Sequence, residues 1–376
     1  MNAALRLAAY YFAYFAYVGA FMPYFPVYLA SRGLGAVEIS LIVSLPQWAR
    51  VFAPALWGWL ADRSGAPRGI VVFSSLAVAL GWCVLPFAEG ASAIAATVAT
   101  MSVLSAGGMP LVEAIALSIA ARTRGGYGPI RLWGSVGFIV AVTGVGAWLD
   151  WRPARDLSVL LPALALASLI VSFAVPSGAW TASADRTRPG AARGAGLRAL
   201  LAAGFCMAVA HGALYAFYTL YLRERGYSGT TIGVLWTLGV AAEIGVFLFL
   251  RVLLRRFALS AILLASFIAA GLRFAAIGAL GGSLSVLVIA QLLHAMTFGA
   301  YHSASVAAVQ RLVPEAARAR SQALFASLSY GAGGAVGAVL AGWTWDAVGH
   351  GQAFLFSAVA GLTGALFVLK LRRAGI

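Results

Sequence analysis

Seven ionisable side chains lie deep inside long apolar stretches of this 376-residue sequence. A charge at the centre of a bilayer costs about 2.5–3.5 kcal/mol on the insertion scale, so such side chains are expected to face a wet cavity or a partner. Carboxylates and imidazoles in an apolar cavity suit proton exchange, because burial disfavours their charged forms and histidine titrates near neutrality. The seven residues are Glu113, Glu243, Arg50, Arg273, His211, His294 and His302.

Glu113 follows Pro110 in the segment GMPLVEAIAL, residues 108–117. In an apolar cavity its affinity for protons would rise, which is what a proton-coupling site requires. We therefore predict a proton-coupling role for Glu113. The alternative is a structural ion pair with Arg122 or Arg131.

Polar and aromatic side chains recur at spacings of three and four along residues 291–305, which places them on one face of a helix. This face carries Gln291, His294, Phe298, Tyr301 and Ser305, and His302 lies one step round from it. Gln291, His294 and Tyr301 are predicted to bind substrate, and His302 to exchange protons. The alternative for each histidine is a hydrogen-bonded packing residue.

Two further candidates lie on one side of the helix expected at 198–222. His211 and Tyr215 are four residues apart, so their side chains are neighbours on a helix. Both are added to the predicted substrate-binding residues.

Aromatic residues form an unbroken stripe along the first apolar stretch, at spacings of four, three, four, three and four. The functional interpretation is an apolar wall with hydroxyl groups for an aromatic substrate, built from Tyr14, Tyr17, Phe21 and Tyr24. The alternative is packing against the fifth apolar span, with the two outermost residues, Tyr10 and Tyr28, as anchors at the membrane surfaces.

Composition excludes an ordinary soluble protein. Hydrophobic residues make up 62% of the chain, charged residues only 10%, and the mean hydropathy is +0.91, whereas soluble proteins carry roughly 25% charged residues. The net charge of +15 does not indicate a nucleic-acid partner, because the cations sit in short clusters between apolar stretches. The two cysteines, Cys83 and Cys206, have no metal-ligand neighbours in the sequence, so we expect no metal site.

Twelve apolar stretches are long enough to span a bilayer, since a spanning helix needs about 20 residues. We therefore expect an all-α membrane protein whose spans lie near 7–30, 38–60, 69–88, 92–121, 129–149, 156–176, 198–222, 230–253, 258–280, 284–310, 318–344 and 351–371. If the N-terminus is cytoplasmic, nineteen of the 26 Lys and Arg residues fall on the inner side. This positive-inside bias predicts that both termini are cytoplasmic.

The two halves of the chain align at an offset of 193 residues. YFPVYLASRGLGAVEIS, residues 24–40, aligns with FYTLYLRERGYSGTTIG, residues 217–233, so that Gly33 corresponds to Gly226. A second pair of segments, GVGAWLD (144–150) and VLAGWTWD (339–346), aligns Gly146 with Gly342. These shared positions predict a parallel repeat of six helices. The same offset makes Arg50 equivalent to Glu243.

The segment GWLADRSGAPR, residues 58–68, resembles the signature loop of major facilitator transporters. By this resemblance Gly58, Asp62, Arg63 and Gly65 form a gating element. Three further segments, IRLWGSVGF (130–138), LLHAMTFGAYHSASVAAVQR (292–311) and SQALFASLSYGAGGAVGAVLAGWTWD (321–346), resemble the phenylpropionate/proton symporter subgroup, which is related to nucleoside and oligosaccharide symporters.

The resemblance implies the major facilitator fold, with two six-helix bundles at 1–176 and 198–376 and a cytoplasmic linker at 177–197. It also implies that helices two and eight meet, so Arg50 and Glu243 could pair, either as a static lock or as a switch that protonation of Glu243 releases. Helix nine would be peripheral, so Arg273 is expected to extend toward the lipid headgroups.

The predicted function is proton-coupled symport of a small organic solute by alternating access. An aromatic carboxylate fits best, with Arg50 binding the carboxylate. The alternatives are a sugar or nucleoside symporter, for which Gln47 and Gln291 would supply amides, and a proton-driven exporter. The sequence has no motif of a membrane enzyme, so we expect a transporter that needs no cofactor. We expect it to be a monomer in a bacterial-type inner membrane and to act on small solutes and protons.

Overall fold

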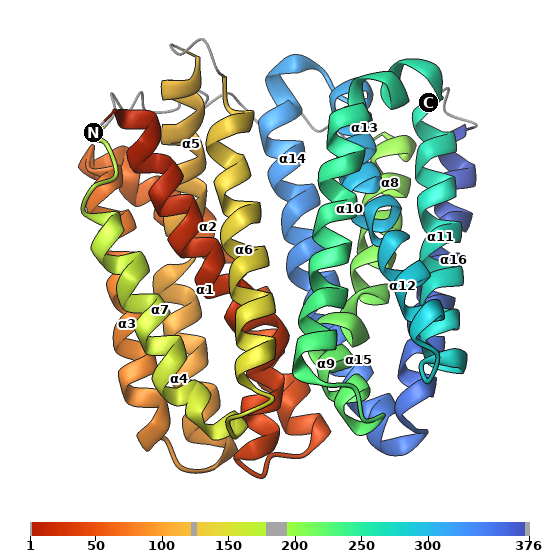
Figure 1. Cartoon of the computed structure of the whole chain (residues 1–376). Helices are drawn as coiled ribbons and strands as arrows, with labels where there is room; N and C mark the ends of the chain where they lie inside the picture. Colours follow the sequence, from red (N-terminus) through yellow and green to blue (C-terminus); the bar gives the residue numbers. More distant parts are fainter. Residues whose placement is uncertain (1, 122–125, 178–193, 373–376) are drawn as a thin grey trace. The chain divides into compact units, whose positions relative to one another are not determined.

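The computed structural model describes residues 2–121, 126–177 and 194–372, and these residues form helices joined by short turns (Figure 1). The α-helices are α1 (Ala3–Ser31), α2 (Ala36–Ser64), α3 (Pro67–Val84), α4 (Gly90–Ser105), α5 (Gly108–Ala120), α6 (Gly128–Trp148), α7 (Leu157–Ser172), α8 (Ala195–Ala210), α9 (Gly212–Glu224), α10 (Gly229–Arg256), α11 (Leu259–Leu280), α12 (Leu284–Leu292), α13 (Tyr301–Leu312), α14 (Arg318–Ala326), α15 (Gly334–Ala347) and α16 (His350–Arg372). Three 3₁₀ segments and two π-helical segments complete the described helices: η1 (Leu85–Phe87), η2 (Ala154–Asp156), η4 (Glu315–Ala317), and the π-helical η3 (Ala295–Ala300) and η5 (Ser327–Gly333).

These segments make twelve helices in the described residues that are long and apolar enough to cross a membrane. Each overlaps one of the twelve predicted spans, so the predicted fold class is confirmed. Large apolar side chains also lie on the outside of these helices, such as Leu248, which is 77% exposed, and Phe249, which is 69% exposed. Exposed apolar surface on this scale suits contact with lipid.

The chain divides into two compact units. Unit 1 comprises Met1–Gly35, Trp48–Ala184 and Ser228–Gly233, and unit 2 comprises Ala36–Gln47, Asp185–Tyr227 and Val234–Ile376. The first turns of α2 therefore group with unit 2, and the first turn of α10 groups with unit 1. The predicted boundaries at 176 and 198 stay a prediction, because residues 178–193 of the linker lie outside the described part.

The predicted repeat accounts for equivalent contacts in the two units. In unit 1 a Cβ at Gly146 would collide with the carbonyl oxygen of Gly229. In unit 2 a Cβ at Gly342 would lie 2.8 Å from the carbonyl oxygen of Ala36, the residue equivalent to Gly229 at the offset of 193. Both positions need glycine because two backbones approach closely there.

Glycines also end equivalent helices. Gly33 follows α1 with φ of +84°, and its repeat partner Gly226 follows α9 with φ of +80°. Residues other than glycine rarely adopt this left-handed backbone conformation. It ends a helix because it lets the following amides donate to the last carbonyl groups of the helix. The amide of Gly33 donates to the carbonyl oxygen of Ala30, and that of Gly226 to Arg223.

Within unit 1, α1 packs along α6 through small residues. A Cβ at Gly19 would lie 2.6 Å from the carbonyl oxygen of Phe138, and a Cβ at Gly137 would collide with that of Phe12. Close backbone approach of this kind is typical of helix pairs in membranes, where water does not drive apolar side chains together. It fixes the orientation of α1 and of its aromatic stripe.

Candidate functional site

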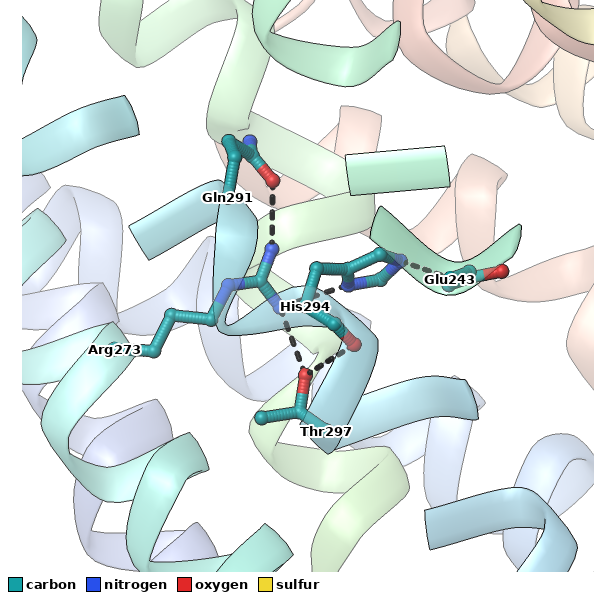
Figure 2. A network of polar contacts seen from close by, with 5 residues as sticks. All are labelled: Glu243, Arg273, Gln291, His294 and Thr297. Carbon is teal, nitrogen blue, oxygen red and sulfur yellow. Dashed lines mark hydrogen bonds and ion pairs between the residues drawn. The ribbon is translucent and has the colours of Figure 1, made fainter. Parts of the chain in front are cut away.

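A buried polar network in unit 2 surrounds Arg273 of α11 (Figure 2). Arg273 is 0% exposed. Its Nη1 donates to Nδ1 of His294 at 3.0 Å and to Oγ1 of Thr297 at 3.2 Å, and its Nη2 donates to Oε1 of Gln291 at 3.0 Å. The prediction that Arg273 extends toward the headgroups is therefore wrong. The guanidinium instead has buried acceptors on the neighbouring helix, which make burial tolerable.

His294 links Arg273 to a carboxylate. Its Nε2 lies 2.8 Å from Oε1 of Glu243, a residue of α10 (Figure 2). A guanidinium only donates, so Nδ1 of His294 must accept from Arg273, and the ring proton must reside on Nε2. His294 is therefore neutral in this arrangement and donates to Glu243. The three residues form a relayed ion pair in which an imidazole separates the two charges.

Local backbone features bring the members of this network together. Gln291, His294 and Thr297 are spaced by three, and the chain changes from α-helix to the π-helical η3 directly after His294. Gly239 of α10 faces this segment, and a Cβ there would lie 3.2 Å from both Oε1 of Gln291 and Cδ2 of His294. The glycine leaves space for the network, and π-helical turns are frequent at functional sites.

The π-helical segment also changes the expected face. The predicted face assumed α-helical spacing from Gln291 to Ser305, and a π-helix turns less per residue, so the register shifts after His294. Tyr301 is 2% exposed and packs edge-on against Phe267 of α11. His302 instead forms a hydrogen bond between its Nδ1 and the hydroxyl of Tyr330 at 2.8 Å. The ring of Phe298 stacks on the rings of both His294 and His302.

His211 lies where α8 ends and α9 begins, beside the same network. Its Nδ1 is 2.8 Å from the carbonyl oxygen of Met207, which can only accept, so Nδ1 carries the proton and Nε2 is free to accept. Nε2 has no hydrogen-bond partner among the described residues. The ring stacks on Tyr215, and its centroid is 6.2 Å from that of His294. The predicted candidates His211, Tyr215 and His294 are therefore neighbours.

A second polar cluster lies in unit 1 around Glu113 of α5. Nε of Arg131 is 3.5 Å from Oε1 of Glu113, and Tyr127 donates a hydrogen bond to Oε2. Burial and the neighbouring Glu113 carboxylate raise the pKa of Tyr127 to about 12, so the hydroxyl remains a donor at neutral pH. This is the alternative pairing with Arg131. Arg122 lies outside the described residues, and the proton-coupling role of Glu113 stays a prediction.

Aromatic rings pack around the guanidinium of Arg131 in this cluster. The guanidinium carbon of Arg131 is 4.2 Å from the ring centroid of Phe15 and 5.6 Å from that of Tyr11. Tyr14 lies within electrostatic reach of Arg131, Arg50 and Glu113. Two cations, one carboxylate and several rings therefore gather in unit 1. Arg273, Thr297 and Tyr127 are members of the two clusters that the sequence did not put forward as site residues, and Arg131 was named only as a possible partner of Glu113.

The remaining stripe residues are engaged in packing. The hydroxyl of Tyr24 donates to the carbonyl oxygen of Val142 on α6 at 2.7 Å, and Tyr17 accepts from the Trp82 indole at 3.0 Å. Phe21 stacks on Tyr17 and meets Trp82 edge-on. These contacts agree with the packing alternative, and α6 is the fifth span. A substrate contact stays a prediction, most directly for the partly buried Tyr14.

Arg50 and Gln47 lie on α2 in different units. Arg50 belongs to unit 1 and has an exposed side chain, while Gln47 groups with unit 2, where a Cβ at Gly334 would lie 3.5 Å from its Cγ. The pairing of Arg50 with Glu243 joins residues of different units and stays a prediction. Within unit 2, His294 is a partner of Glu243 that the sequence did not indicate.

The predicted gating loop contains a tight glycine turn. Gly65 has φ of +62° between the end of α2 and the start of α3 at Pro67. Asp62 and Arg63 are exposed, and the guanidinium of Arg63 lies 5.5 Å from the ring centroid of Trp59. A Cβ at Gly58 would meet nothing within 4 Å. The turn is confirmed, and the gating role of these residues stays a prediction.

Metal ligation has no support in the described residues, where no group of three or more His, Cys, Asp or Glu side chains could hold an ion. The two clusters contain carboxylate, imidazole and guanidinium groups, which are able to exchange protons or to bind an anion.

Comparisons with known proteins identify the family of the chain. The model of the MFS_1 like family matches residues 4–356. The chain is 30% identical over 371 residues to the "Probable 3-phenylpropionic acid transporter" of Escherichia coli (strain K12), covering 94% of each chain. It is 27% identical to the maltose permease of Geobacillus stearothermophilus, covering 97% of this chain and 93% of the permease.

A solved structure has the same fold. The nucleoside transporter NupG, as its D323A mutant, superimposes with a TM-score of 0.88 at 18% sequence identity, covering 98% of this chain and 100% of that one.

Proposed function

Because the chain belongs to the MFS_1 like family of membrane transporters, we propose that it is a proton-coupled symporter of a small organic solute that works by alternating access. Aromatic carboxylates are the favoured substrate class. The relayed ion pair of Glu243, His294 and Arg273 is the observation that carries the proposal. An enzymatic role has no support in the family.

Glu243 is the proposed proton-binding residue of unit 2. His294 cannot take a second proton while Nδ1 accepts from Arg273, because both ring nitrogens would then need acceptors. A proton that enters this network therefore binds the Glu243 carboxylate, which is only 13% exposed.

Protonation of Glu243 would couple to anion binding through charge. The neutral acid no longer compensates Arg273 through His294, so the buried guanidinium would carry an unbalanced positive charge. Binding of an anionic substrate would restore the balance, and linkage requires that each binding event strengthens the other. A proton and a carboxylate would thus be bound together, as symport requires.

The proposed substrate class rests on the cations and aromatic rings of unit 1 and on the name of a similar protein. Arg50 and Arg131 supply cations near Tyr14, and the rings of Phe15 and Tyr11 flank Arg131. Cations and aromatic walls together suit an aromatic ring bearing a carboxylate. The name of the Escherichia coli relative indicates the same chemistry. The alternative is a sugar, supported by the maltose permease at 27% identity and by the amides of Gln47 and Gln291.

The placement in the cell belongs to the same proposal. The excess of Lys and Arg in alternate loops supports a bacterial-type inner membrane with both termini in the cytoplasm. A monomer remains the expected state.

Uptake into proteoliposomes tests the function. We expect 3-phenylpropionate to accumulate when an inward proton gradient is imposed, and Glu243→Gln to abolish accumulation while keeping gradient-free exchange, because the amide mimics the protonated acid. Glu224→Gln is the matched control, since Glu224 also pairs with a histidine, His350, at 2.6 Å but at an exposed site. Normal gradient-driven accumulation by Glu243→Gln would disprove the role of Glu243. Accumulation of maltose but not 3-phenylpropionate would favour the sugar alternative.

A further inference from the structure

An apolar groove in unit 2 lies apart from the polar network. Its cavity volume is about 340 Å³, at the lower end of the roughly 300–1,000 Å³ of ligand-binding cavities. Helices α8 and α16 and the π-helical segment η5 form its walls. The lining residues are Leu201, Ala202, Phe205, Cys206, Leu328 and Phe367. We name this cavity the α8–α16 groove.

A cation lies at one end of each long wall. Arg198 is exposed and precedes Leu201 by three residues, so it extends the groove-lining face of α8 by one turn. On α16, Gly364 faces Cys206, because a Cβ there would lie 3.1 Å from the Cβ of Cys206. Phe367 lies one turn further along α16, and Lys370 one turn beyond it. Its exposed ammonium is 5.4 Å from the Phe367 ring centroid.

The two walls therefore end in positive charge on the same side. Arg198 is eight residues before Cys206 on α8, and Lys370 is six residues after Gly364 on α16. Helix α8 begins the seventh membrane-capable span and α16 forms the twelfth, so the two helices run in opposite directions. Because Cys206 and Gly364 face each other, the two cations therefore lie at the same end of the groove. Both helix ends belong to the predicted cytoplasmic membrane surface, where anionic lipids attract Lys and Arg.

Exposed apolar residues adjoin the lining residues along the chain. Leu366, next to Phe367 on α16, is 61% exposed, and Leu324, one turn before Leu328, is 44% exposed. Apolar side chains on the outside of a membrane-spanning helix are solvated by hydrocarbon, so these surroundings suit an acyl chain better than a water-soluble ligand. The groove thus offers hydrocarbon contacts along its length and two cations at its end.

We propose that the α8–α16 groove binds one acyl chain of an anionic glycerophospholipid whose phosphate is bound by Arg198 and Lys370. The site is distinct from the proposed proton-binding network, so its test does not depend on transport. A bound lipid would fill the space between α8, α16 and η5 and hold these elements together.

Native mass spectrometry of the full-length protein in detergent, titrated with phosphatidylglycerol or phosphatidylcholine, tests the charge recognition. We expect phosphatidylglycerol to bind more tightly, and Arg198→Gln with Lys370→Gln to weaken it roughly 30-fold, because a cation near the surface contributes about fivefold. The control pair Arg251→Gln with Arg256→Gln removes the same charge from exposed positions on α10. Equal loss in both double variants, or equal binding of the two lipids, would overturn the proposal.

A thiol-protection measurement tests the location without altering the groove. Cys83 and Cys206 are the two cysteines of the chain, so Cys83→Ser leaves Cys206 on the groove wall as the single thiol. Saturating phosphatidylglycerol should slow alkylation of Cys206 by N-ethylmaleimide, and the Arg198→Gln, Lys370→Gln background should remove this protection. An unchanged alkylation rate at saturating lipid would place the lipid elsewhere and contradict the proposal.

Discussion

At the scale of single residues, hydrogen-bond roles decide the charge states in the unit 2 network. Arg273 can only donate, which makes Nδ1 of His294 an acceptor and places its proton on Nε2. Glu243 receives that proton as a hydrogen bond at 2.8 Å. The assignment follows from donor and acceptor chemistry alone, and it supports the proposal that Glu243 binds the additional proton.

Replacing Arg273 by lysine should disrupt this network although the charge is kept. The guanidinium donates to Gln291 through Nη2 and to both His294 and Thr297 through Nη1. An ammonium group donates from one nitrogen and cannot reproduce this planar geometry. We expect Arg273→Lys to destabilise the protein by about 1–3 kcal/mol, because a buried acceptor loses its donor. Thermal unfolding in detergent measures the effect. Arg223→Lys, at an exposed position, should leave the unfolding temperature unchanged.

Arg50 is predicted to recognise the charge of the substrate and not its ring. Arg50→Ala should therefore weaken binding of 3-phenylpropionate about tenfold or more, since hydrogen bonds to charged groups contribute about 1.5–3 kcal/mol. The uncharged 3-phenylpropanamide is the built-in control, and its affinity should be weak and unaffected by the substitution. Calorimetric titration measures both affinities. Equal affinities of acid and amide for the unaltered protein would exclude Arg50 as the anion partner.

At the scale of the elements, glycine positions decide how closely helices approach. Gly239 leaves space for Gln291 and His294 beside α10, and Gly137 allows α6 to approach the backbone of α1. The helix that contains Gln291 and His294 departs from α-helical winding directly after His294. Spacing rules for an ideal α-helix therefore apply up to His294 and fail across η3.

The α1–α6 contact provides a matched test on one helix. Gly137→Ala would bring a Cβ into the Phe12 backbone, which cannot move as a flexible side chain could, so we expect a loss of about 1–3 kcal/mol. Gly144→Ala on the same helix meets nothing within 4 Å and should be neutral or stabilising by up to about 1 kcal/mol. Unfolding temperatures of the two variants give the comparison. Similar values would argue against tight α1–α6 packing.

At the scale of the whole molecule, the charge distribution predicts orientation. With the N-terminus inside, nineteen of the 26 cations lie on the cytoplasmic side, and the twelve spans found in the described residues return the C-terminus to that side. A green fluorescent protein fused after the last residue should therefore fluoresce in bacterial cells. An alkaline phosphatase fused at the same position should be inactive, because it matures only outside the cytoplasm. Active phosphatase would reverse the predicted topology.

The sequence by itself determined the features that follow from local composition. Long apolar stretches must form helices in a bilayer because every backbone polar group needs a partner within its own segment, so twelve spans could be counted directly. Shared glycines such as Gly33 and Gly226 identified the repeat, because their backbone conformation excludes other residues. The candidates Glu243, Gln291 and His294 were identified because polar side chains are rare in membrane-spanning segments.

Only the tertiary structure decided which of these groups meet. Arg273 appeared peripheral in the sequence, yet its guanidinium lies among Gln291, His294 and Thr297. Its partners are 18 to 24 residues away on another helix, and their contact depends on the winding of η3 and on the space at Gly239. Likewise Tyr17 and Tyr24 proved to be bonded within unit 1. A helical pattern gives the face of one helix but not the neighbour that this face contacts, because contacts between helices depend on side-chain shapes from distant parts of the chain.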